Sequence, residues 1–79
     1  MPWTSSLTAP IVLKSGIKLR SLGDGRDLFL TMSERSRAKE HWRSTFELLL
    51  KAASNSGTEL DVARAARKLS RALETDRLI

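Results

Sequence analysis

The chain has 79 residues, no cysteine, and 14 Lys and Arg against nine Asp and Glu, which gives a formal net charge of +5 and a pI near 10.5. This length allows one domain with a small core, and without cysteine neither a disulfide nor a thiolate metal site can stabilise it. A hydrophobic fraction of 41% argues against disorder, no apolar run is long enough to span a membrane, and the first ten residues have no cation ahead of an apolar run, so we expect a cytoplasmic globular protein.

The sequence predicts one compact domain at residues 10–79, preceded by a flexible arm at residues 1–9. The arm contains Thr, Ser, Ala and Pro, and chain termini of this composition are typically loose. No internal repeat, low-complexity tract or linker divides the rest of the chain. We expect an α+β fold, in which an N-terminal two-stranded antiparallel β-hairpin packs against two or three α-helices.

The stretch IVLKSGIKLR, residues 11–20, predicts the hairpin. A three-residue loop, Lys14-Ser15-Gly16, places Gly16 in the left-handed conformation that such loops require. Because side chains alternate along a strand, this register gives the hairpin one apolar face and one outer face. The apolar face holds Ile11, Leu13, Ile17 and Leu19. The outer face holds Val12 and the secondary basic face, defined as Lys18 and Arg20.

Residues 23–34 fit both a strand and a helix. As a strand, RDLFLTM extends the hairpin to three strands. As a helix, Asp24 caps the start, and Leu28 and Met32 share one face. Leu, Met and Glu favour the helix whereas Phe and Thr favour the strand, so composition leaves both open. We interpret Gly23-Asp24-Gly25 as a turn, because the Gly-x-x-x-x-Gly-Lys pattern of a phosphate loop is missing.

Two amphipathic helices follow, at residues 34–54 and 58–75, joined by the turn residues SNSG. The short connection predicts that they are antiparallel neighbours. The second helix opens at Thr58, with Asp61 in capping-box spacing. The apolar stripe of the first helix consists of Ala38, Trp42, Phe46, Leu49 and Ala53. That of the second consists of Val62, Ala66, Leu69 and Leu73.

The C-terminal helix also carries the one feature with functional potential, a row of cations that we call the basic stripe. It consists of Arg64, Arg67, Lys68 and Arg71. These side chains span roughly 100° of the helix surface, opposite the apolar stripe. Four cations on one face fit contacts with phosphates, and they also fit an ordinary solvated helix face.

No group of residues can be assigned catalytic or metal-binding roles. His41 is the only histidine, and although Ser44 and Thr45 follow it closely, no Gly-x-Ser-x-Gly context surrounds them. Zinc-ligand spacing is missing, and the acidic residues lack the order of a calcium loop. We therefore expect no enzyme and no cofactor, and we interpret His41 as a half-buried residue at the boundary of its helix.

The order of these elements, with the run Ala63-Arg64-Ala65-Ala66 in the last helix, resembles a family of small bacterial proteins known as domain of unknown function 982. The resemblance extends roughly from Pro10 to Leu78. It implies a helix near residues 24–32, and it implies no catalytic or binding residue.

From these features we expect a small, non-enzymatic bacterial protein that binds another protein. The alternative is a nucleic-acid-binding regulator that uses the basic stripe. A homodimer formed by edge pairing of the hairpin is a secondary hypothesis, because a two-stranded sheet has two free edges and the core is small.

Overall fold

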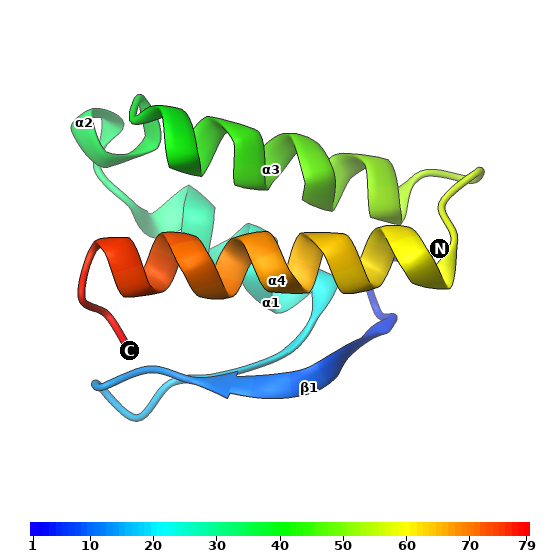
Figure 1. The fold of residues 1–79 in the computed structure, drawn as a ribbon, viewed down its shortest axis with the longest axis horizontal. Coiled ribbons are helices and arrows are strands. Elements are labelled where there is room, and N and C mark those ends of the chain that lie inside the picture. The colour runs from blue at the N-terminus through cyan, green and yellow to red at the C-terminus, as the bar shows by residue number, and fades with distance from the viewer.

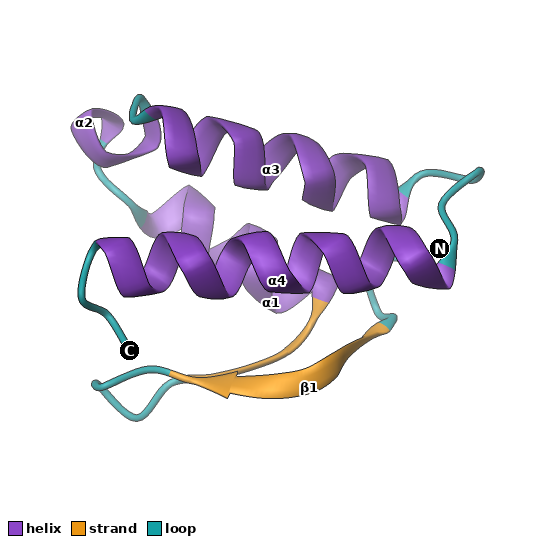
Figure 2. Cartoon of the chain, in the orientation of Figure 1, coloured by secondary structure: helices purple, strands orange, loops and turns teal.

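The computed structural model describes all residues 1–79 and has an α+β fold (Figure 1). Its elements are β1 (Ser6–Val12), β2 (Lys18–Ser21), α1 (Leu22–Thr31), α2 (Glu34–Arg37), α3 (Glu40–Ala53) and α4 (Glu59–Thr75). The long helices α3 and α4 lie side by side in opposite directions, with the hairpin along one side of the helical layer (Figure 2). This arrangement confirms the predicted fold class.

The hairpin has the predicted register. Ile11 lies opposite Leu19, the Leu13 N–H donates to the Ile17 carbonyl at 2.8 Å, and Gly16 has a φ of +94°. Leu13 and Leu19 are buried on the face toward the helices. The prediction was wrong for Ile17, which is 53% exposed, because it lies between the hairpin loop and β2 and lines an open pocket beside α1 instead of entering the core.

The first strand begins at Ser6, so the predicted arm at residues 1–9 is too long by four residues. Leu7 is only 5% exposed and belongs to the core, an apolar anchor that the polar composition around it concealed. Further toward the terminus, the Trp3 carbonyl accepts the Gly23 N–H at 2.8 Å, and the Arg26 guanidinium lies 4.8 Å from the centre of the Trp3 ring.

Residues 22–31 form helix α1, which settles the open choice for this segment. Ser21, and not Asp24, is the N-cap, and the two side chains form a reciprocal capping box. The predicted Gly23-Asp24-Gly25 turn is therefore wrong, since these residues make the first turn of the helix. Gly25 permits close packing there, because a Cβ atom on it would lie 3.1 Å from Leu69 Cδ2.

The predicted helix at 34–54 is divided into α2 and α3. Ser33 caps α2 by accepting the Ser36 N–H, and α3 starts again at Glu40. Ala38, predicted to be buried, is exposed in the connection. Because α3 packs against both α1 and α4, its buried side is rotated from the predicted stripe. The buried residues of α3 are Trp42, Thr45, Leu49 and Ala52, whereas Phe46 and Ala53 are half-buried.

Helix α4 has the predicted start, with a capping box between Thr58 and Asp61. Its predicted apolar stripe is buried, together with Ala65 and Ala72. The helix ends at Thr75, Arg77 then has a left-handed φ of 58°, and the Leu78 N–H returns to the Leu73 carbonyl at 2.8 Å. The Leu78 carbonyl then accepts the Lys14 N–H, which attaches the C-terminal segment to the hairpin.

Candidate functional site

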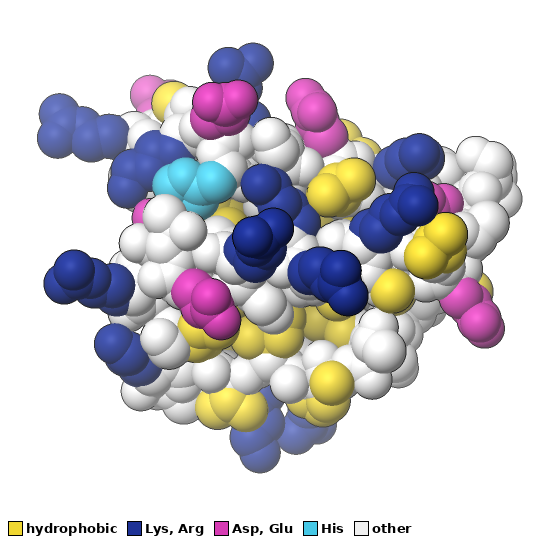
Figure 3. Space-filling view, in the orientation of Figure 1, with side chains coloured by type: hydrophobic (Ala, Val, Ile, Leu, Met, Phe, Trp, Pro, Cys, Tyr) yellow, Lys and Arg dark blue, Asp and Glu magenta, His cyan; other side chains and the backbone are white.

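The basic stripe lies on the outer side of α4. Arg64, Arg67 and Arg71 are exposed, and Lys68 is half-buried. None of the four belongs to an ion pair. The ion pairs of the structure join Arg26 to Asp27, and Lys39 and His41 to Asp76. Figure 3 shows this face, with Lys and Arg side chains standing over α4. The stripe therefore presents cations without carboxylate partners.

A groove runs beside the stripe, between β1 and α4. It has two parts, of about 650 Å³ and about 510 Å³, which meet at Thr8 and Ala63. The first part includes Leu60 and Val62, and the second includes Arg67 and Arg71. Hydrophobic side chains are exposed between α4 and β1 in Figure 3. We call this feature the β1–α4 groove; it joins an apolar surface to half of the basic stripe.

The secondary basic face lies apart from the stripe. Lys18 and Arg20 are exposed on β2, which packs against α1, whereas β1 packs against α4. The basic stripe therefore lies on the β1 side of the hairpin, and the secondary basic face lies on the β2 side. The two do not form one continuous surface.

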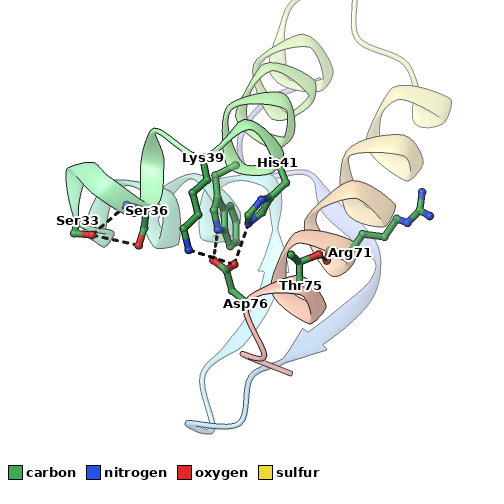
Figure 4. A network of polar contacts seen from close by, with 8 residues as sticks. Ser33, Ser36, Lys39, His41, Arg71, Thr75 and Asp76 are labelled. Carbon is green, nitrogen blue, oxygen red and sulfur yellow. Dashed lines mark hydrogen bonds and ion pairs between the residues drawn. The ribbon is translucent and has the colours of Figure 1, made fainter.

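The structure also contains a polar cluster around Asp76, which follows the last turn of α4. The indole Nε1–H of Trp42 donates to Asp76 Oδ2 at 2.6 Å, and His41 Nε2 lies 3.0 Å from Asp76 Oδ1. The Lys39 ammonium lies 3.7 Å from the same Oδ1. Figure 4 shows Lys39 and His41 pointing at this carboxylate, whereas Arg71 points away from it. We call these four residues the Asp76 cluster.

Hydrogen bonding and charge stabilise the Asp76 carboxylate. The hydrogen bond from Trp42 lowers the pKa of Asp76, with further lowering from His41 and Lys39, while partial burial opposes the shift. The side chain is 16% exposed. An ionised carboxylate at this position thus links the start of α3 to the end of α4.

The Asp76 cluster does not resemble a catalytic site. A histidine paired with a carboxylate activates a nucleophile only when a hydroxyl or thiol bonds to the imidazole. Here the Thr45 hydroxyl donates to the His41 backbone carbonyl at 2.6 Å and not to the ring. The structure contains no group of three His, Cys, Asp or Glu side chains placed to hold a metal ion. The arrangement is suited to joining two helices.

Sequence reasoning missed the cluster because its members are far apart in the chain. His41 was expected to be half-buried, and its side chain is 25% exposed, but Asp76 lies 35 residues away. No local spacing connects them. The adjacent His41-Trp42 pair, which carries two ring N–H groups near the helix start, was the only available signal.

Comparison with family models, with curated proteins and with solved structures finds no match to the chain. The resemblance to domain of unknown function 982 therefore stays a prediction. No helix of the structure has the length and apolarity required to cross a membrane.

Proposed function

We propose that this chain is a small, non-enzymatic, cytoplasmic module that binds another protein. The observation that carries the proposal is the β1–α4 groove, in which an apolar surface borders cations that have no partner within the chain. Protein interfaces commonly combine a desolvated apolar centre with arginine at its margin. The other polar cluster, at Asp76, has its hydrogen bonds satisfied internally and leaves little for a ligand.

Nucleic-acid binding is the second candidate, and the four cations of the basic stripe favour it. The aromatic side chains count against a base-stacking platform. Trp42 is buried, Phe29 and Phe46 stack on each other at 4.3 Å, and Trp3 lies under Arg26. None of them lines the β1–α4 groove, so a nucleic acid would be held by phosphate contacts alone.

A homodimer through the hairpin edges has less support. Pro10 on β1 has no N–H to donate, and the Lys14 N–H beyond it is taken by Leu78. On β2, the Arg20 N–H donates to the Asp24 carboxylate at 2.8 Å. Both edges thus offer few free donors to a second copy.

We retain membership of domain of unknown function 982 as part of the proposal, supported by helix α1 near the position that the resemblance implies.

Affinity capture with matched charge variants tests the proposal. The wild-type protein, the Arg67→Glu/Arg71→Glu variant and the Lys18→Glu/Arg20→Glu variant are used as baits in nuclease-treated lysate. We expect a protein that is retained by the wild type and by the hairpin variant and lost by the α4 variant. Binding to random duplex at about 50 mM salt, with a steep salt dependence weakened by Arg71→Ala, would favour the nucleic-acid alternative instead.

A further inference from the structure

We infer that the β1–α4 groove binds an extended, acidic segment of a partner protein, in which an apolar side chain and a carboxylate stand three to four residues apart. This inference rests on the proposed function, since it names the chemistry of the protein partner. It follows from the division of the groove into an apolar part and a basic part, and from the strand that forms one of its walls.

The apolar part accepts a side chain of the partner. Leu60 is 59% exposed there, the highest exposure among the exposed large hydrophobic residues of the chain, and Val62 and Ala63 line the same part of the groove. The opposite wall comes from Met1, from Ser5 just before β1, and from Ser6 and Thr8 of β1. The space between the two walls is open, so an apolar residue of the partner can cover Leu60.

The basic part accepts a carboxylate. Arg67 and Arg71 are one helical turn apart and both line the groove, and neither has an acidic partner within the chain. Guanidinium groups bind carboxylates through paired hydrogen bonds, which favours Asp or Glu over other polar residues. Glu59 and Glu74 lie at the two ends of the groove and would repel acidic residues placed there. The charge pattern therefore favours one central acidic position.

The wall formed by β1 favours an extended partner segment. β1 belongs to a two-stranded sheet, so its edge away from β2 has no neighbouring strand. Backbone groups on that edge can bond to a chain that runs alongside the strand. Pro10 interrupts the donors, so we expect a few backbone bonds around Thr8 and not a continuous ladder.

The helix sets the spacing of the two recognised side chains. The middle of the Leu60–Ala63 surface and the middle of the Arg67–Arg71 pair are seven to eight residues apart on α4. At about 1.5 Å per residue this separation is about 11 Å. An extended chain advances about 3.3 Å per residue, so it covers the distance in three to four residues.

A displayed library of random ten-residue peptides tests the inference, with selection on the wild-type protein. We expect the enriched peptides to share an apolar residue and an Asp or Glu at the stated spacing. Synthetic copies should lose at least tenfold in affinity for Arg67→Glu/Arg71→Glu and for Ala63→Arg, which obstructs the groove. Their affinity for Lys18→Glu/Arg20→Glu, the same charge change on the other side of the hairpin, should stay within about twofold, since surface charges act locally in salt.

Three outcomes would overturn the inference: no enrichment, enriched peptides without acidic residues, or equal losses in the α4 and hairpin variants. Circular dichroism of each variant separates a binding defect from unfolding. Affinity capture with the same charge variants distinguishes failure of the groove from failure of the protein-binding module. A protein partner that is retained by Arg67→Glu/Arg71→Glu would refute the groove while leaving a protein-binding module. Failure to capture any protein, with salt-dependent binding to duplex, would refute the module itself.

Discussion

The Asp76 cluster joins the end of α4 to the start of α3, the basic stripe lies along α4, and the two differ in how their charges are satisfied. Asp76 receives a hydrogen bond from Trp42 and has two further neighbours at the start of α3, the Lys39 ammonium and the His41 ring. The basic stripe has four cations and no acidic partner. A charge with internal partners contributes to stability, whereas a solvated charge contributes little and is available to a ligand. We therefore expect substitutions in the cluster to alter unfolding and substitutions in the stripe to alter binding.

Trp42→Ala should have the largest effect. Trp42 is fully buried, and its loss removes both core volume and the donor to Asp76. Substitutions of this kind cost about 3–5 kcal/mol, which is a large part of the stability of a small domain. Urea denaturation followed by circular dichroism measures the change. A cost below about 1 kcal/mol would show that the cluster and the core beneath it do not stabilise the fold.

Asp76→Ala should cost about 2 kcal/mol, because it leaves the Trp42 N–H without its charged acceptor and removes the partner of the Lys39 ammonium and of the His41 ring. Glu47→Ala on the exposed side of α3 is the control, with an expected change within about 0.5 kcal/mol. Equal unfolding free energies for the two variants would contradict the distinction between internal and solvated charges.

The stability contributed by Asp76 should depend on pH in the acid range. The folded protein holds the pKa of Asp76 below its ordinary value of 3.8, so near that value the unfolded state binds more protons and acid favours unfolding. The difference in unfolding free energy between the wild type and Asp76→Asn should be constant at neutral pH and shrink as the pH falls below 3.8. Urea titrations across this range measure it, and an undiminished difference at the lowest pH would contradict the assignment.

Arg77→Gly should stabilise the protein by about 0.5–1 kcal/mol. Arg77 adopts a left-handed conformation at the end of α4, which strains any residue with a Cβ atom. Arg77→Ala keeps the strain and should show no gain, which makes it the matched control in thermal unfolding. A destabilised glycine variant would contradict the assignment of strain to Arg77.

Arg67→Glu/Arg71→Glu should have the smallest effect on stability, within about 0.5 kcal/mol, because both side chains are exposed and unpaired. Urea denaturation checks this expectation. A loss comparable to that of Asp76→Ala would show that the stripe has a structural role.

Features that depend on neighbouring residues could be predicted from the sequence, and features that depend on distant ones could not. The hairpin register followed from the spacing around Gly16, and the start of α4 from Thr58 and Asp61. The break between α2 and α3 was missed, since the periodicity of residues 34–54 continues through it. The partners of His41 and the groove beside Arg67 arise from tertiary packing alone.

The central claim is that the β1–α4 face binds and the Asp76 cluster does not. Amide chemical shifts of the ¹⁵N-labelled protein, titrated with a selected peptide, test it most directly. We predict shifts at residues 6–9 and 11 of β1 and at residues 60–74 of α4, and unchanged resonances at Lys18, Arg20 and His41. Shifts centred on α2 and the start of α3, with α4 unaffected, would contradict the account.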